Sequence, residues 1–166
     1  MATITLQGNN IQTNGNLPAI GERAPDFTLV NQDLGNVGLD DFAGKKKLIS
    51  IVPSLDTPVC ASSTKKFAAL AAEREDIIVI IVSADLPFAM SRFCSSEKVE
   101  NVVTLSMMRS QKFAEDYGVL IQDGPLAGIT ARAVVILDAD NNVKYTELVG
   151  EIADEPDYDA AVDALA

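Results

Sequence analysis

The chain has 166 residues, of which 48% are hydrophobic and 22% charged, so its size and composition predict one globular domain over residues 1–166. Its longest apolar run, Ile77 to Val82, is far shorter than the roughly 20 residues that span a membrane. Thirteen Lys and Arg residues against 24 Asp and Glu residues leave a net charge of -11, which opposes binding to nucleic acids and to anionic membrane surfaces.

The sequence contains no histidine, which excludes Ser-His-Asp and Cys-His catalysis and histidine-ligated metal sites. Two cysteines, Cys60 and Cys94, are too few for a zinc site or a disulfide framework, so we expect neither a metal nor a cofactor. Residues 1–5 lack the basic and apolar parts of a signal peptide, which favours a cytoplasmic protein. In that reducing compartment, cysteines are more often reactive or inert than structural.

The N-terminal region predicts a β-hairpin followed by a loop. Thr3 to Gln7 alternates polar and apolar residues, Gly8-Asn9 is a turn signal, and Ile11 to Thr13 suits the return strand. Residues 14–18 (Asn-Gly-Asn-Leu-Pro) predict a loop, and residues 27–30 a short strand.

Two continuous apolar runs, Lys47 to Val52 and Ile77 to Val82, are typical of strands buried on both faces. The segment between them predicts a helix, with Thr57 as its N-cap and Pro58 at its first position. Three apolar residues of that helix then recur at helical spacing: Phe67, Leu70 and Ala71.

The alternation of strands and helices continues beyond residue 82. We predict a helix over residues 87–93 opened by Asp85, a strand over 102–105, and a helix over 110–117 that ends at Gly118. Residues 133–137 and 143–148 predict two strands joined by a polar turn, and Pro156 opens a last helix with one apolar face: Tyr158, Val162 and Leu165.

This order of elements predicts an α/β protein with a thioredoxin-like fold. A central mixed β-sheet is flanked by helices on both faces, with a β-hairpin at the N-terminus. In the polar turn, Asp138, Asp140 and Asn142 match the first ligand positions of a calcium loop. Val143 replaces the turn glycine and Val149 the bidentate glutamate, so a simple hairpin turn is the better interpretation.

One segment, Pro53 to Cys60, combines features that indicate chemistry. Cys60 falls in the first turn of a predicted helix, where free N–H groups and the helix dipole favour a thiolate. Ligands usually bind at this edge of an α/β sheet, and Thr57 can direct a hydroxyl to the same site. Two alternatives remain open from the pattern: Cys60 is a small buried apolar residue, and Thr57 only caps the helix.

These residues carry a family resemblance. The pattern Pro53-x-x-x-Thr57-x-x-Cys60 resembles the peroxidatic motif of the peroxiredoxins. Five further segments resemble the bacterial thiol peroxidases, which are atypical two-cysteine peroxiredoxins, and they extend the similarity over essentially the whole chain: 84–89, 91–94, 123–126, 131–134 and 155–158.

The resemblance implies a role for each matching residue. Cys60 corresponds to the peroxidatic cysteine, which forms a sulfenic acid, and Cys94 to the resolving cysteine, which joins it in an intramolecular disulfide. Arg132 corresponds to the active-site arginine, and Thr57 and Pro53 to the residues that hold and shield the peroxide. Both cysteines lie in predicted helices, so we expect a helical turn to unwind before they join.

Three of the residues in these segments have simpler interpretations. Arg132 can instead form a surface ion pair, and Cys94 can be a core cysteine in a helix rich in phenylalanine. Met90 stands where relatives often carry a polar residue, which suggests contact with a substrate or a second subunit, but it also suits a gap in the core.

The implied function is reduction of hydrogen peroxide and organic hydroperoxides by a homodimer, with thioredoxin reducing the disulfide. An alternative is a thiol-based redox sensor or switch on the same fold, and a third is a scaffold with inert cysteines. The complete set of Pro53, Thr57, Cys60 and Arg132 favours the peroxidase, since a switch needs neither the threonine nor the arginine.

Overall fold

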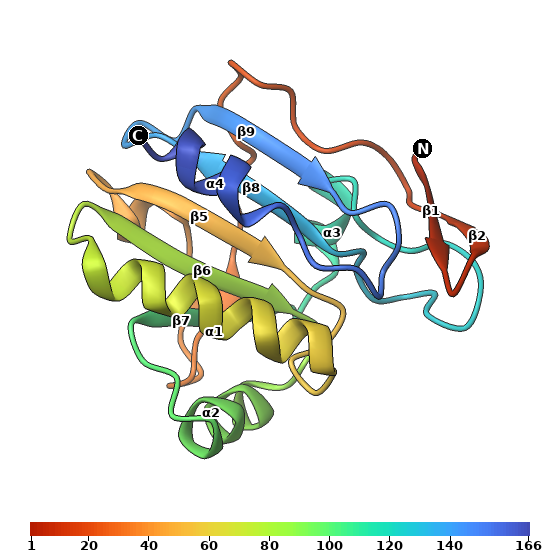
Figure 1. Cartoon of the computed structure of the whole chain (residues 1–166), viewed down its shortest axis with the longest axis horizontal. Helices are drawn as coiled ribbons and strands as arrows, with labels where there is room; N and C mark the ends of the chain where they lie inside the picture. The colour runs from red at the N-terminus through yellow and green to blue at the C-terminus, as the bar shows by residue number, and fades with distance from the viewer.

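The computed structural model describes all residues, 1–166, and confirms the predicted fold class (Figure 1). The N-terminal hairpin pairs β1 (Thr3–Leu6) with β2 (Asn9–Gln12). The other strands are β3 (Leu29–Val30), β4 (Asn36–Val37), β5 (Lys46–Ile51), β6 (Ile77–Ser83), β7 (Val102–Ser106), β8 (Ala133–Leu137) and β9 (Val143–Leu148). The helices are the 3-10 turn η1 (Leu39–Phe42), α1 (Pro58–Glu73), α2 (Pro87–Ser96), α3 (Lys112–Asp116) and α4 (Tyr158–Ala164).

Seven strands form one mixed sheet in the order β4-β3-β7-β6-β5-β8-β9. The three central strands β5, β6 and β7 are parallel because α1 and α2 carry the chain back between them, whereas β8 runs antiparallel to β5. The side chains of β5 from Lys47 to Ile51 are all buried, as expected for a strand covered on both faces.

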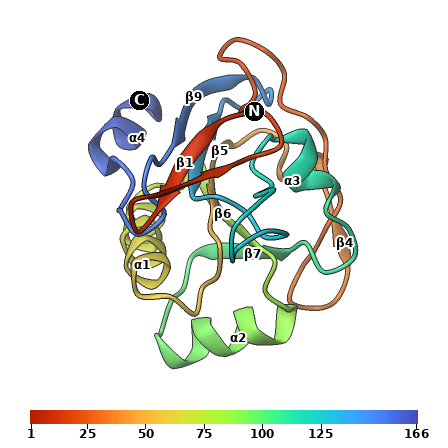
Figure 2. The same ribbon diagram turned by 90° about the vertical axis from the view of Figure 1, so that its right-hand side faces the viewer.

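Helices cover both faces of the sheet, and Figure 2 shows α1 and α4 on one side and α3 on the other. On the first face, side chains of α1, α2 and α4 pack on the sheet in one apolar cluster that includes Phe67, Met90 and Leu165. On the second face, Phe113 of α3 stacks on Tyr117 with ring centroids 4.3 Å apart and meets Phe27 edge to face. These two layers form the core.

Strand direction brings two distant segments to one edge of the sheet. The chain leaves β5 after Ile51, which pairs with Ala133, the first residue of β8. Because the two strands are antiparallel, the loop that follows β5 lies beside the residue that precedes β8. That residue is Arg132, and the loop leads directly to Cys60.

Several boundaries differ from the predictions for local reasons. The hairpin turns at Gln7-Gly8, both with positive φ (50° and 82°), so β2 begins at Asn9 instead of Ile11. Helix α2 begins at Pro87, as predicted, but Leu86 instead of Asp85 is its N-cap, because the Asp85 carboxylate accepts a hydrogen bond from a neighbouring loop. It also continues to Ser96, which places Cys94 inside the helix.

The last helix presents two of the three predicted residues, Tyr158 and Leu165, to the apolar cluster, but Ala161 takes the place of Val162. Ala161 and Leu165 are buried, whereas Val162 is 40% exposed. Ala161 and Leu165 are four positions apart and so share a face, while Val162 is one position after Ala161, about 100° around the helix.

Strand β4 and the turn η1 were not predicted, because two-residue and four-residue elements leave no periodic pattern.

The polar segment between β8 and β9 is a hairpin turn, as predicted. The Asp138 carboxylate accepts hydrogen bonds from the Asp140 and Asn142 amides, both at 2.9 Å, and Asn141 adopts a positive φ of 69°.

The longest helix, α1, has 16 residues, and none of the helices has the length and apolar character to cross a membrane.

Gly118 supports a testable prediction about stability. It follows α3 with a φ of +70°, and a Cβ atom there would overlap the backbone of Asn16. Gly118→Ala should therefore lower the free energy of unfolding by about 3 kcal/mol, from backbone strain plus overlap. Gly44→Ala is the control, because Gly44 has a φ of +86° with open space around it and should cost only about 1 kcal/mol. If urea denaturation shows that both variants lose the same free energy of unfolding, the steric explanation is contradicted.

Candidate active site

Cys60 lies in the first turn of α1, as its position after a buried strand predicts. Thr57 occupies the N-cap with extended backbone angles (φ -128°, ψ 148°), and Pro58 is the first helical residue. Cys60 is therefore the third helical residue, among the free N–H groups at the positive end of the helix dipole. Its side chain is completely buried in the apolar cluster below α1.

Arg132, which directly precedes β8, bonds the sulfur of Cys60. Its Nη1 donates a hydrogen bond to Cys60 Sγ at 3.0 Å, although the two residues are 72 positions apart. Its Nε donates to the carbonyl oxygen of Ile152 at 2.9 Å, and the residue is only 3% exposed. A surface ion pair is therefore the wrong interpretation of Arg132. The buried guanidinium favours a negatively charged sulfur.

Thr57 and Pro53 belong to the loop between β5 and α1. The Thr57 hydroxyl donates to the carbonyl oxygen of Ser54 at 2.9 Å and makes no side-chain capping bond to the helix. Thr57 thus occupies the capping position without capping through its side chain. Its hydroxyl oxygen keeps lone pairs that can accept a further hydrogen bond. Pro53 is buried directly after Val52.

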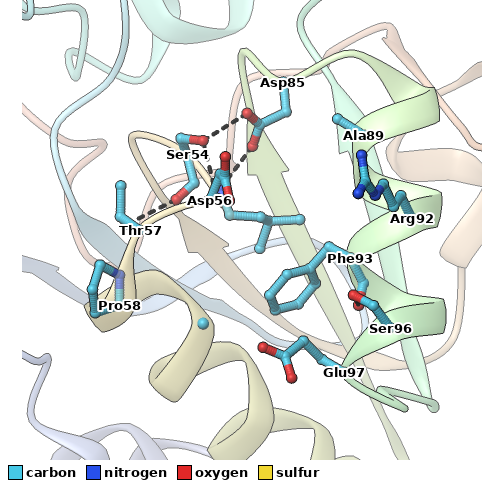
Figure 3. Close-up of a pocket in the computed structure, with 12 residues that line it drawn as sticks. Ser54, Asp56, Thr57, Pro58, Asp85, Ala89, Arg92, Phe93, Ser96 and Glu97 are labelled. Carbon is cyan, nitrogen blue, oxygen red and sulfur yellow. Dashed lines mark hydrogen bonds between the residues drawn. The ribbon is translucent and has the colours of Figure 1, made fainter.

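A cleft of about 660 Å³ lies between the start of α1 and helix α2 (Figure 3). Leu55 and Thr57 line it on one side, and Ala89, Arg92 and Phe93 of α2 line it on the other. Neither cysteine is among its lining residues. The cleft therefore separates the loop that leads to Cys60 from the helix that carries Cys94.

Cys94 is a free, half-buried thiol on α2, and the structure does not join it to Cys60, which is also free. It lies outside the apolar clusters, so it is not a core cysteine. Burial raises the pKa of the Cys94 thiol, and a long hydrogen bond from Gln32 Nε2, 3.9 Å from the sulfur, only partly opposes this rise.

Comparisons with known proteins agree with this geometry. The Redoxin family model matches residues 19–162. The thiol peroxidases of Mycobacterium tuberculosis and Mycobacterium bovis are each 56% identical to this chain over 165 residues, which are 99% of this chain and of the relative. A peroxiredoxin-like protein from Aquifex aeolicus superposes with a TM-score of 0.93 at 42% identity, over 99% of this chain and 96% of that one.

The chain belongs to the thiol peroxidases. This membership confirms the resemblance seen in the sequence and makes the chain a peroxiredoxin-type enzyme. The solved structure of a thiol peroxidase from Chromobacterium violaceum has the same fold, with a TM-score of 0.92 at 26% identity, covering 99% of this chain and 96% of its own. The similarity extends from the hairpin to the last helix.

The segments that resemble the thiol peroxidases do not all lie at Cys60. Residues 131–134 supply Arg132, and residues 155–158 lie beside α1, where Glu155 accepts hydrogen bonds from Lys66 and Tyr158. Residues 123–126 instead contact the N-terminal hairpin, because Asp123 accepts the amide of Gln12 at 2.8 Å. Only some of the family pattern therefore concerns the cysteine itself.

Met90 is fully buried in the same apolar cluster as Cys60. It fills a gap in the core and presents no surface to a substrate or a second subunit, so the simpler interpretation of this residue is the correct one.

Two polar residues of this thiol peroxidase site were missed by the sequence analysis. Thr130 is buried and donates to the carbonyl oxygen of Val52 at 3.0 Å, which fixes the end of β5. Asp85, predicted as a helix cap, accepts the Leu55 amide at 2.7 Å instead. Neither partner is close in sequence, so no local pattern indicates the contact; the only signal for Asp85 is its place in the family-like segment 84–89.

The raised pKa of Cys94 predicts how its reactivity depends on pH. A thiol reacts as the thiolate, so Cys94 should remain protonated and slow to react at neutral pH. In a Cys60→Ser variant, the rate of Cys94 alkylation by iodoacetamide should reach half its maximum above the ordinary cysteine pKa of about 8.5. Mass spectrometry of samples quenched across a pH series measures this, and a midpoint at or below 8.5 would contradict it.

Proposed function

We propose that this thiol peroxidase reduces hydrogen peroxide and organic hydroperoxides through the thiolate of Cys60. The observation that carries the proposal is the 3.0 Å hydrogen bond from the buried Arg132 guanidinium to Cys60 Sγ at the start of a helix. The helix dipole and the guanidinium both stabilise negative charge on this one sulfur. A thiolate is the form of cysteine that attacks a peroxide.

In the first step, Cys60 Sγ attacks one oxygen of the peroxide and the O–O bond breaks. The attacked oxygen keeps its hydrogen and forms a sulfenic acid on Cys60, and the other oxygen leaves as hydroxide or alkoxide, which takes a proton to give water or an alcohol. Arg132 stabilises the thiolate and the charge that develops on the leaving oxygen. Thr57 accepts a hydrogen bond from the peroxide through a lone pair that its bond to Ser54 leaves free.

The burial of Cys60 has two consequences for this step. Pro53 and the rest of its loop keep bulk water away from the sulfur, which strengthens the electrostatic effect of Arg132. A peroxide, however, reaches the fully buried sulfur only when the first turn of α1 opens slightly. We therefore place the substrate between this turn and the loop that contains Pro53 and Thr57.

In the second step, the Cys94 thiol attacks the sulfenic sulfur of Cys60, which forms a disulfide and releases water. A disulfide needs Cα atoms about 4.4–6.8 Å apart, whereas the two cysteines lie on separate helices beside the cleft. The first turn of α1, the end of α2 or both must therefore unwind before the bond can form.

The chain contains no third cysteine, so an external dithiol has to reduce the disulfide, and we propose thioredoxin for this role. Two free thiols suit the cytoplasm.

We also propose a homodimer, because large apolar side chains are exposed at one edge of the sheet. Leu86, Phe88 and Met108 are 51%, 65% and 38% exposed. Leu86 and Met108 follow the neighbouring parallel strands β6 and β7, so they lie at the same sheet edge, where a second subunit would cover them.

The alternative function, a redox sensor or switch, needs only the two cysteines. It does not need an arginine that is buried against the sulfur or a threonine hydroxyl held beside the first turn of α1. The Arg132–Cys60 contact therefore favours the peroxidase.

Cysteine substitutions test the two-step mechanism. Cys60→Ser should abolish peroxidase activity, because no other residue can attack the O–O bond. Cys94→Ser should consume about one peroxide per chain and then stop, because thioredoxin needs a disulfide to attack. A coupled assay with thioredoxin, its reductase and NADPH measures turnover, and mass spectrometry after one equivalent of peroxide locates the added oxygen.

Two results would contradict the mechanism. One is a sulfenic acid on Cys94 in place of Cys60. The other is a wild-type disulfide that links two chains. Steady turnover of the wild type without any disulfide would also exclude Cys94 as the resolving cysteine.

Arg132→Lys tests the role of the guanidinium. Lysine keeps the positive charge but lacks the planar fork that bonds Cys60 and Ile152 together, so the oxidation of Cys60 by peroxide should slow about a hundredfold while the fold is retained. Arg109→Lys is the control: Arg109 also makes two hydrogen bonds, to Asn36 and Leu34, but it is exposed and bonds neither cysteine. Near-normal oxidation in Arg132→Lys would show that the fork is unnecessary.

A further inference from the structure

The loop before Cys60 lacks the hydrogen bonds that hold most of the backbone. No amide of residues 53–57 donates to a backbone carbonyl, although β5 before the loop is paired on both sides and α1 begins directly after it. The backbone therefore leaves the conformation of this loop to side chains.

One carboxylate, that of Asp85, holds the loop through one of these amides and through a neighbouring side chain. It accepts hydrogen bonds from the Ser54 hydroxyl, the Leu55 amide and the Ser83 hydroxyl, each at 2.7 Å. Its own backbone is held in turn, because the Asp85 amide donates to Ser83 Oγ and the Asp85 carbonyl accepts the Ser106 hydroxyl. Asp85 is thus a rigid point at the ends of β6 and β7.

The bonds continue from Asp85 to Thr57 through Ser54, as Figure 3 shows. Ser54 Oγ donates to Asp85 and accepts the Asp56 amide at 3.1 Å, which fixes the orientation of the Ser54 peptide. The carbonyl oxygen of that peptide accepts the Thr57 hydroxyl at 2.9 Å. The direction of the Thr57 hydroxyl therefore depends on Asp85 through two hydrogen bonds.

We propose that Asp85 is a positioning residue for the peroxide reaction, which keeps Thr57 and the first turn of α1 in the arrangement that lets Cys60 attack an O–O bond. The inference rests on the proposed peroxidase function. Asp85 touches neither the sulfur nor the peroxide; it acts through Ser54 and the Leu55 amide. Small displacements of catalytic groups have large effects on rate, so the loss of this anchor should slow the first step.

A positioning role and a merely structural role predict different ratios of two rates, the oxidation of Cys60 by peroxide and its alkylation by iodoacetamide. Iodoacetamide and hydrogen peroxide both need access to the buried Cys60, so a loosened fold raises both rates. Both reagents also react with the thiolate that Arg132 stabilises, but only the peroxide needs Thr57 in place as well. Loss of positioning should therefore lower the rate of oxidation relative to the rate of alkylation.

The test uses Asp85→Asn and Ser54→Ala, each in the full chain with Cys94→Ser so that the reaction stops at the sulfenic acid. Quenched samples analysed by mass spectrometry give both rates for Cys60. We expect the ratio of oxidation to alkylation to fall about tenfold in each variant. Asp138→Asn is the matched control, because the Asp138 carboxylate also accepts loop amides but lies at the opposite end of β8. The ratio should not change in that variant.

The double variant tests whether the two residues act as one unit. Because Asp85 acts partly through Ser54, the double variant should lose no more than the larger single loss, instead of the product of the two. If Asp85→Asn fails to fold, Ser54→Ala still decides the inference, since it removes one hydroxyl and leaves the carboxylate.

The possible failures are distinguishable. An unchanged ratio in Ser54→Ala, or an equal fall in Asp138→Asn, overturns the role of Asp85 while the peroxidase function stands. If the chain with only Cys94→Ser forms no sulfenic acid, the proposed function fails and the inference fails with it. Disulfide formation, measured in Asp85→Asn with Cys94 intact, should not slow, because that step requires the loop to leave its anchored position; a slower second step would also contradict the proposal.

Discussion

The contact between Arg132 and Cys60 is the constraint on which the rest of the structure depends. Burying a guanidinium costs several kcal/mol unless its donors are bonded, and here they meet a sulfur and the Ile152 carbonyl with no carboxylate in contact. In the proposed mechanism, the thiolate of Cys60 is the contacting group that compensates this positive charge. Antiparallel β8 makes the contact possible, because it begins beside the end of β5.

The helix that presents Cys60 serves two opposing needs. The first turn of α1 must be folded to offer its N–H groups to the sulfur, yet in the proposed mechanism part of the structure must unwind so that Cys94 can reach Cys60. A loop held by side chains suits both needs. Two hydrogen bonds to Asp85, from the Ser54 hydroxyl and the Leu55 amide, define its position, and they can be broken without disturbing the ladder of bonds in the sheet.

The two thiols differ in their surroundings in a way that matches the two proposed roles. Cys60 is fully buried beside a cation at a helix N-terminus, whereas Cys94 lies near the end of α2, is half-buried, and has a raised pKa. A nucleophile benefits from a stabilised thiolate, while a resolving thiol needs only to reach the sulfenic sulfur. The absence of histidine leaves arginine as the group that favours the thiolate.

The sequence by itself determined the fold class, the strands β8 and β9, the position of Cys60 in a first helical turn and the family. These follow from local patterns: apolar periodicity, the Thr57-Pro58 start of a helix, and motifs of contiguous residues. Only the tertiary structure decided that Arg132 is buried against Cys60, that Thr57 bonds Ser54, that Val162 faces outward, and that Asp85 holds a loop and does not cap a helix. The Arg132 and Asp85 contacts join residues about 30 to 70 positions apart, and the direction of a side chain depends on which strands pair. No local pattern encodes which strands pair, and it is this pairing in the sheet that brings the residues of the site together.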